Sequence, residues 1–299
     1  MTFPRLIATD LDGTLLRSDR SVSDRTCATL RECTDAGVEL VLVTARPHRT
    51  VVDLARRIGC AATAICANGA AVLDVRAGVT DLVRTFSVRR ALEIVAALRP
   101  LLPAGTGFAL ETGDEVFRDP LFRPGIVSGD GSVLIDDVAM ARPAGGRYVK
   151  VLARSEVVSA DVLLDAVRPV LTDIAEPSHS GGRGLLEIAP PGATKADTLA
   201  WHCARVGVDA HEVVAFGDMP NDLPMLTWAG TAYAVANAHP DVLAVVDRVT
   251  ASNDEDGVAA ALEEIVSGRR AGRASRSGQP SRPGRSGQPD QTSQSTSSK

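Results

Sequence analysis

Two carboxylates separated by one residue, Asp10 and Asp12, follow a short apolar stretch near the start of the chain and precede Gly13 and Thr14. If residues 6–9 form a strand, side chains at i and i+2 point to the same face, so the two carboxylates converge just past its end. Like charges held that close repel each other unless a cation or a proton relieves them. A hard cation favours carboxylate oxygens, and a protonated carboxyl can act as a general acid. The pattern therefore favours a chemical site over an acidic turn.

Other polar residues stand where further strands are expected to end. Thr44, Asn68 and Asp218 each follow closely on a run of mainly apolar residues. Strands and helices alternate in these regions, which predicts a parallel sheet with crossover helices. In such sheets ligands gather at the carboxyl ends of the strands. We therefore expect these residues and Asp10 at one site, although Thr44 alone would also fit a helix cap.

Lysine is scarce, because the 32 basic residues include only Lys150, Lys195 and Lys299. Lysine and arginine are not interchangeable where a compact charge is needed. Lys195 is expected in the first turn of a helix, where the helix dipole disfavours a cation, and this favours a functional role over a solvated one. Lys150 is expected to snorkel from a strand. Arg46 is interpreted as a surface residue.

The regular alternation is interrupted in the middle of the chain. We expect a doubly wound parallel α/β core whose two halves are residues 1–85 and 189–267. We expect an inserted α+β cap at residues 86–188. We expect the last helix to end near Val266. Residues 268–299 are mostly Ser, Gly, Arg, Gln and Pro and have no apolar face to bury, which predicts a disordered basic tail.

Composition limits the partners and the compartment. The chain has 299 residues and is 44% hydrophobic, as globular proteins are. No apolar run reaches the roughly 18 residues of a membrane span, and the start of the chain lacks the layout of a signal peptide. The net charge is −5 although the tail is basic, so the body is acidic and nucleic-acid binding is not expected. The five cysteines lack paired or metal-like spacing, which predicts reduced thiols in a cytoplasmic protein. The oligomeric state cannot be read.

In their order and spacing, the motifs resemble those of the haloacid dehalogenase superfamily. The four motifs of that family would be Asp10 with Asp12, Thr44, Lys195, and Asp218 with Asp222. The large insertion between the second and third motifs, with Asn68-Gly69-Ala70 and the stretch 217–226, looks like the Cof-type branch and its type IIB cap. Ala45 and Ala196 replace glycines that are common in the family, but neither change removes a functional side chain.

The resemblance implies a magnesium-dependent phosphatase that hydrolyses a small phosphorylated metabolite, such as a sugar phosphate, through an aspartyl-phosphate. Asp10 would be the nucleophile and Asp12 the general acid and base. The side chains of Asp10 and Asp218 and the backbone carbonyl of Asp12 would hold Mg²⁺, with Asp222 supporting it directly or through water. Phosphate and substrate would be bound by the remaining candidates, Thr44, Ala45, Lys195, Asn68 and Asn221.

Other functions fit some of these residues. A phosphomutase or phosphotransferase of the same superfamily would pass the phosphoryl group to a second hydroxyl instead of water. A phospho-accepting receiver also uses an acidic pair, a Thr and a Lys, but it is shorter and places its acceptor Asp after the third strand, where this chain has Asn68. A binding protein without activity is disfavoured because every acidic and polar position of the motifs is intact.

Overall fold

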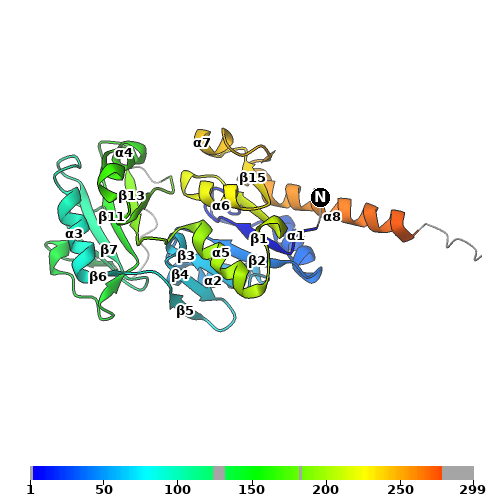
Figure 1. Ribbon diagram of the computed structural model, residues 1–299, viewed down its shortest axis with the longest axis horizontal. Helices are drawn as coiled ribbons and strands as arrows, with labels where there is room; N and C mark the ends of the chain where they lie inside the picture. Colours follow the sequence, from blue (N-terminus) through cyan, green and yellow to red (C-terminus); the bar gives the residue numbers. More distant parts are fainter. Residues whose placement is uncertain (1–2, 124–131, 182–183, 278–299) are drawn as a thin grey trace, which may run out of the picture.

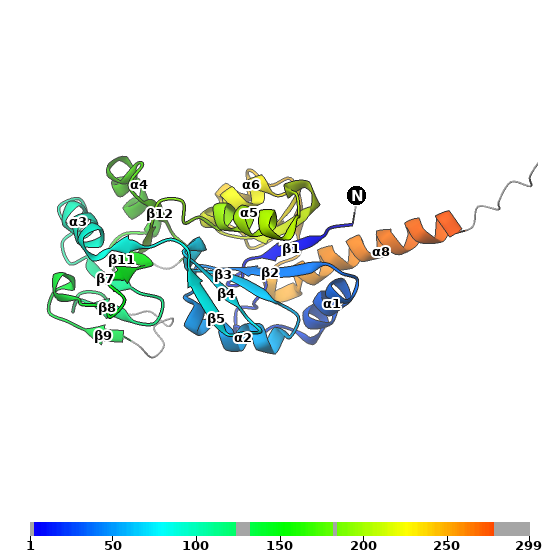
Figure 2. The same ribbon diagram turned by 60° about the horizontal axis from the view of Figure 1, so that its bottom comes forward.

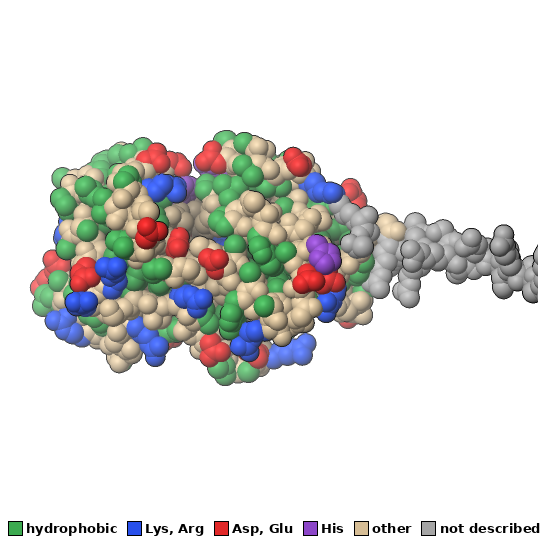
Figure 3. Space-filling model, viewed as in Figure 1, with side chains coloured by type: hydrophobic (Ala, Val, Ile, Leu, Met, Phe, Trp, Pro, Cys, Tyr) green, Lys and Arg blue, Asp and Glu red, His purple; other side chains and the backbone are tan. Residues whose placement is uncertain are grey.

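The computed structural model describes residues 3–123, 132–181 and 184–277, with the backbone alone for 269–277. Their strands form a core sheet and a cap sheet that lie next to each other along the long axis of the molecule (Figure 1). On the face drawn in Figure 3, acidic and basic side chains are scattered over both parts. No helix in the described ranges is long and apolar enough to cross a membrane.

The core sheet has the strand order β16-β15-β14-β1-β2-β3-β4-β5. Its strands are β1 Leu6–Thr9, β2 Glu39–Val43, β3 Thr63–Cys66, β4 Ala71–Asp74, β5 Val79–Leu82, β14 Val213–Gly217, β15 Thr231–Val235 and β16 Val249–Thr250. The strands from β16 to β3 pair in parallel, and β4 and β5 add an antiparallel hairpin at one edge. The strand order reverses direction at β1, which therefore lies in the middle of the sheet.

Helices cover both faces of the core sheet. They are α1 Asp24–Asp35, α2 Val52–Ile58, α5 Lys195–Val206, α6 Leu223–Trp228, α7 Pro240–Leu243 and α8 Gly257–Ser277, with short 3-10 turns at His48–Thr50, Ala67–Gly69, Ala210–Glu212, Pro220–Asp222 and Asn253–Glu255. Alternation along β1 sends Ile7 into the cluster with α1, α2 and α8, and Leu6 and Ala8 into the cluster with α5 and α6. Burial on both faces explains why the inner strands are nearly all apolar.

The cap sheet has the strand order β12-β13-β11-β7-β8-β9. Its strands are β7 Gly107–Glu111, β8 Val116–Arg118, β9 Ser132–Leu134, β11 Lys150–Arg154, β12 Glu176–Ser178 and β13 Leu185–Ala189; β6 Phe86–Ser87 and β10 Arg147–Tyr148 pair separately, and a 3-10 turn spans Val138–Met140. The helices α3 Val88–Leu98 and α4 Ala160–Leu171 pack on one face of the sheet. We propose on this division that the core and the cap meet near residues 85 and 188, as expected from the sequence.

The predicted end of the last helix is wrong. Helix α8 does not stop near Val266 but runs to Ser277, on the side of the core away from the cap sheet (Figures 1 and 2). Ala and Arg in this stretch are good helix formers, and a helix already formed grows without a new nucleation step. The predicted disorder is therefore contradicted for residues 268–277, and residues 278–299 lie outside the described part of the chain.

Candidate active site

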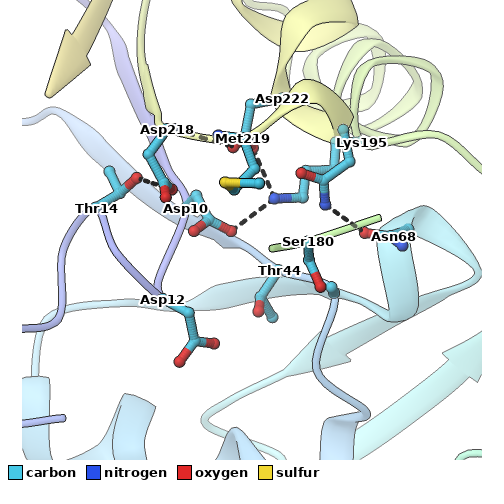
Figure 4. A network of polar contacts seen from close by, with 12 residues as sticks. Asp10, Asp12, Thr14, Thr44, Asn68, Ser180, Lys195, Asp218, Met219 and Asp222 are labelled. Carbon is cyan, nitrogen blue, oxygen red and sulfur yellow. Dashed lines mark hydrogen bonds and ion pairs between the residues drawn. The ribbon is translucent and has the colours of Figure 1, made fainter. Parts of the chain in front are cut away.

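Four of the candidate residues meet at the carboxyl ends of parallel strands. Asp10 follows β1, Thr44 follows β2, Asn68 lies just after β3, and Asp218 follows β14. Because β1 pairs in register with both β2 and β14, these strands end at the same edge of the core sheet, next to the cap (Figure 4). The convergence expected from the strand pattern is therefore present in the structure.

Lys195 connects the first motif to the last. It is the first residue of α5, which Thr194 caps, and its side chain is 1% exposed. Its Nζ donates to Oδ1 of Asp10 and Oδ1 of Asp222, each at 2.6 Å (Figure 4). Burial by itself would lower the pKa of Lys195, but the charges of Asp10 and Asp222 outweigh it and hold the pKa above its usual value. Lys195 is therefore a fixed cation beside Asp10.

The carboxylates of Asp10, Asp218 and Asp222 each offer an oxygen within 4.8 Å of the others. Burial, together with the neighbouring carboxylates, raises the pKa of Asp10 well above its usual value, although Lys195 opposes this. Burial and the charge of Asp222 also raise the pKa of Asp218, to about 7. Desolvated, mutually repelling carboxylates are stabilised by a cation, and an all-oxygen donor set suits a hard one. These residues fit Mg²⁺.

The three carboxylates are not equally available to a cation. Asp222 is fully buried, and its Oδ2 accepts from the backbone N–H groups of Asp218 at 3.1 Å and Met219 at 3.0 Å. Its Oδ1 already accepts from Lys195. Asp222 therefore shapes the loop after β14, and Asp10 and Asp218 are better placed to be side-chain ligands.

The turn after β1 packs directly against Asp218. The hydroxyl of Thr14 donates to Oδ1 of Asp218 at 2.6 Å. Gly13 has a φ of +80°, and a Cβ there would lie 2.4 Å from Oδ2 of Asp218. Sequence reasoning noted both residues only as the end of a strand, because a contact across 204 positions of sequence leaves no local signal.

Asp12 does not join the carboxylate cluster. Its side chain points away from Asp10 in Figure 4 and accepts two hydrogen bonds from Arg46, at 2.6 Å from Nε and 2.5 Å from Nη2. This hydrogen bonding raises the pKa of Arg46, whose side chain is only 15% exposed. The interpretation of Arg46 as a surface residue is therefore wrong. The assignment of the Asp12 carbonyl to Mg²⁺ stays a prediction.

Thr44 and Ala45 form the floor of the site next to Asp12. Thr44 is buried, and its Oγ1 accepts from the backbone N–H of Arg46 at 3.1 Å. It does not cap the following helical turn, whose N-cap residue is Pro47 and which has no side-chain cap bond. The carbonyl of Ala45 accepts from Nζ of Lys150 at 2.6 Å. The two residues line the cavity, and Ala45 also anchors the cap.

A second buried network crosses from the cap to the core. Besides its bond to Ala45, Lys150 donates to Oε2 of Glu187 at 2.5 Å, and Nδ2 of Asn68 donates to the same oxygen at 3.1 Å. Nδ2 of Asn221 donates to Oδ1 of Asn68 at 3.1 Å. Lys150 is 3% exposed, so the expectation that it snorkels is wrong. Asn68 and Asn221, expected to bind phosphate or substrate, are buried links in this network, and that binding role stays a prediction.

A cavity of about 590 Å³ separates the two sheets at this point. Asp10, Asp12, Thr44 and Lys195 line it from the core, together with Ala45 and Asn221. The cap contributes charged residues that sequence reasoning did not place there, chiefly Glu111, Lys150 and Glu187. The described arrangement is thus an acidic cluster with one fixed cation at the base of a chamber roofed by the cap sheet.

Comparison with known proteins places most of the chain in one family. A family model described as haloacid dehalogenase-like hydrolase matches residues 7–262. The chain is 28% identical to 5-amino-6-(5-phospho-D-ribitylamino)uracil phosphatase YitU of Bacillus subtilis, covering 89% of this chain and 99% of that protein. It is 27% identical to pyridoxal phosphate phosphatase YbhA of Escherichia coli, covering 85% and 96%.

Solved structures agree on the fold. A haloacid dehalogenase-like hydrolase from B. subtilis superimposes with a TM-score of 0.74 at 26% identity, covering 87% of this chain and 99% of the other. The subclass IIB sugar phosphatase BT4131 superimposes with a TM-score of 0.70 at 19% identity, covering 87% and 98%. The predicted α/β core with an inserted cap sheet is confirmed by these neighbours.

Proposed function

Because this chain belongs to the haloacid dehalogenase-like hydrolases of the Cof type, and the relatives that it matches are named as phosphatases, we propose that it is a magnesium-dependent phosphatase for small phosphorylated metabolites. One observation carries the proposal. Asp10 stands at the base of a cavity between the core and the cap, held 2.6 Å from Nζ of Lys195, with the carboxylate of Asp218 beside it. A nucleophile, a fixed cation and a place for a divalent cation therefore face one space.

The first half of the reaction uses Asp10 as the nucleophile. An oxygen of its carboxylate attacks phosphorus, the bond from phosphorus to the leaving oxygen breaks, and an aspartyl-phosphate forms. Lys195 stabilises the negative charge of Asp10 and of the phosphoryl oxygens. Asp12 enters this step in its protonated form and donates its proton to the leaving oxygen, and Arg46 then holds the resulting carboxylate by two hydrogen bonds.

The second half returns Asp10 to its starting state. Asp12, now deprotonated, takes a proton from a water molecule that attacks the aspartyl-phosphate, and inorganic phosphate leaves. Arg46 directs the Asp12 carboxylate toward this water, and one of its two hydrogen bonds is given up when Asp12 takes the proton. Thr44, at the end of β2, is placed to donate to a phosphoryl oxygen once the substrate is bound.

Mg²⁺ would be held by the side chains of Asp10 and Asp218, with Asp222 in support. When bound, it offsets the repulsion between the phosphate dianion and the attacking carboxylate. Thr14 and Gly13 keep Asp218 in place for this role. The donor set fits, because these buried carboxylates otherwise repel each other at close range.

A small substrate is supported by the size of the chamber and by the relatives. About 590 Å³ suits a small-molecule ligand, for which sites of about 300–1,000 Å³ are usual. YitU and YbhA are named for phosphorylated small molecules, and BT4131 for sugar phosphates. We extend to this chain the class they share, a phosphate monoester of a metabolite.

Phosphate release from a panel of sugar, nucleotide and cofactor phosphates tests the proposal. We expect release that depends on Mg²⁺ and that Asp10→Asn abolishes. The same assays with an added sugar acceptor distinguish hydrolysis from transfer, because a transferase would form a new phosphate ester at the expense of free phosphate. Undiminished release by Asp10→Asn would overturn the mechanism.

A further inference from the structure

The cavity above Asp10 is larger than a phosphoryl group requires. Its polar end, where Asp10, Asp12 and Lys195 lie, belongs to the core. The rest of its volume of about 590 Å³ must receive the leaving group of the ester, and the wall there is the cap sheet. The side chains on that wall therefore decide which alcohol the site accepts.

Strand β11 shows which cap side chains face the cavity. Side chains alternate between the two faces of a strand. Val151 and Ala153 belong to the hydrophobic cluster that packs with α3 and α4. Lys150, Leu152 and Arg154 lie on the opposite face and line the cavity. The wall is thus charged at both ends of β11 and apolar between them.

The apolar part of the wall is a hydrophobic cluster of its own, which we call the apolar wall. It consists of Ala109, Phe122 and Leu152, with Val116 and Leu185 packed against it. Strand register pairs Leu152 with Ala109, and the cluster members other than Ala109 line the cavity. This face of the cap sheet is covered by the ligand chamber and not by α3 and α4, so packing of the cap does not require apolar side chains there. The apolar character of the cluster therefore indicates that the ligand presents an apolar group to it.

Phe122 is held in its position by a built turn. The carboxylate of Asp119 accepts from the backbone N–H of Phe108 at 3.0 Å, of Leu121 at 3.1 Å and of Phe122 at 2.8 Å. The turn presses so closely on β7 that a Cβ on Gly107 would lie 1.9 Å from the backbone nitrogen of Phe122. The ring is therefore preorganised, which reduces the entropy lost when a ligand packs on it.

Most charged groups around the apolar wall already have partners. The pairs are Arg49 with Glu111, Arg154 with Glu156, and Lys150 with Glu187. A polyol here would exchange its hydrogen bonds to water for few unpaired partners among the described wall residues, which is unfavourable. A flat ring would lose few such bonds and would bury apolar surface against Phe122 and Leu152. The buried Oδ1 of Asn221 and the buried Nε of Arg49 lack partners, so the former can still accept and the latter still donate one hydrogen bond.

We propose, on the basis of the proposed phosphatase function, that the substrate is a monoester whose leaving group carries an aromatic or heteroaromatic ring. The phosphate lies at Asp10 and Lys195, and the ring packs on the apolar wall. Leu152 and Phe122 are then specificity-determining residues for this reaction. Open-chain sugar phosphates are poorer substrates, in contrast to the sugar phosphate expected from the sequence.

The test compares esters of primary alcohols, so that the reacting bond is the same. Benzyl phosphate and pyridoxal 5′-phosphate provide a ring, and ribitol 5-phosphate provides a polyol. With Mg²⁺ and the intact protein, we expect kcat/KM to be about tenfold or more higher for the ring esters, as contact in an apolar pocket typically provides.

Two variants locate the preference on the wall. Leu152→Asn and, separately, Leu185→Asn should lower the ratio of kcat/KM for the ring esters to kcat/KM for ribitol 5-phosphate by about tenfold. Val162→Asn is the matched control, because Val162 is an aliphatic residue of the cap that is 53% exposed on α4. Thermal melting of each variant shows that the cap is folded.

The outcomes separate this inference from the function on which it rests. A ring preference that either wall variant removes supports the proposal. Equal or better hydrolysis of ribitol 5-phosphate by the wild type, or a ring preference unchanged in the folded wall variants, overturns it and leaves the phosphatase function intact. No phosphate release from either class of ester overturns the phosphatase function itself.

Discussion

Two of the three lysines, Lys195 and Lys150, are buried between acceptors, yet their surroundings differ. Lys195 bridges Asp10 and Asp222, which both belong to the core sheet and its loops. Lys150 comes from cap strand β11 and bridges Glu187 of the cap to a backbone carbonyl of the core. The first lysine joins two motifs within one part of the molecule, and the second joins two parts.

The carboxylate partners explain what the difference means. Glu187 accepts hydrogen bonds from Lys150, Asn68 and Ser180, so both of its oxygens are occupied. Asp10 is buried among other carboxylates, and its pKa is raised despite Lys195. Burial of a lysine is therefore not in itself a sign of catalysis. Where the carboxylate has all its hydrogen bonds, as Glu187 does, the buried pair is a structural connection. Where the carboxylate lacks enough positive charge, as Asp10 does, the site can bind a further cation or a phosphoryl group.

The largest effect is expected from Asp10→Asn. An amide cannot form the aspartyl-phosphate, so phosphate release should fall by roughly 10⁴-fold or more, as for other removed nucleophiles. Single-turnover release with saturating Mg²⁺ measures this. Asp53→Asn is the control, because that side chain is 93% exposed and should retain the wild-type rate.

Changing each lysine to methionine tests the comparison directly. Lys195→Met removes the cation beside the reacting groups and should lower kcat by roughly 10²–10³-fold. Lys150→Met leaves the catalytic groups in place and should affect KM more than kcat, because it loosens the cap. Steady-state kinetics of both variants give the answer, and equal losses of kcat would mean that Lys150 also acts on the reaction.

Stability measurements sharpen the structural side of the comparison. Lys150→Met leaves the buried carboxylate of Glu187 without its cation, which should cost about 3–5 kcal/mol in the free energy of unfolding. The double variant Lys150→Met/Glu187→Met removes both charges and should recover most of that loss. Urea denaturation of the two single variants and the double variant completes the cycle, and simple additivity would contradict a coupled pair.

The smallest effect concerns the carboxylate cluster and pH. Burial raises the pKa of Asp218 to about 7, so its proton competes with Mg²⁺ below that pH. The apparent affinity for Mg²⁺ should fall by up to about tenfold per pH unit below pH 7 and level off above it. Titration calorimetry at several pH values measures this, and Asp218→Asn should weaken binding and remove its share of the pH dependence.

The raised pKa of Asp218 also makes the stability of the metal-free protein depend on pH, in the direction opposite to that of the Mg²⁺ affinity. The folded state holds this proton more tightly than the unfolded chain, so the contribution of Asp218 to stability is fully present below about pH 4 and is lost as the pH rises through about 7. Melting with a chelator should show this slope, and added Mg²⁺ should oppose it. A melting temperature insensitive to Asp218→Asn across this range would contradict the assignment.

The local pattern of apolar and polar residues was enough to predict much of the fold and the positions of the motifs. The apolar runs before Asp10, Thr44 and Asp218 predicted parallel strands, and the geometry of a parallel sheet then required these residues to meet at one edge. The scarcity of lysine also drew attention to Lys195, which is not solvated but paired with Asp10 and Asp222, and its functional role stays a prediction. These predictions succeed because strand alternation and sheet topology are short-range or general rules.

The sequence by itself thus determined the core, the inserted cap and the carboxylate edge of the site. Only the tertiary structure decided that Arg46 holds Asp12, that Lys150 is buried against Glu187, and that an apolar wall faces the chamber. Each of these contacts joins side chains from separate elements, and the packing of the cap on the core selects which ones meet. No periodicity along the chain encodes that choice, because burial and pairing depend on what lies opposite in space.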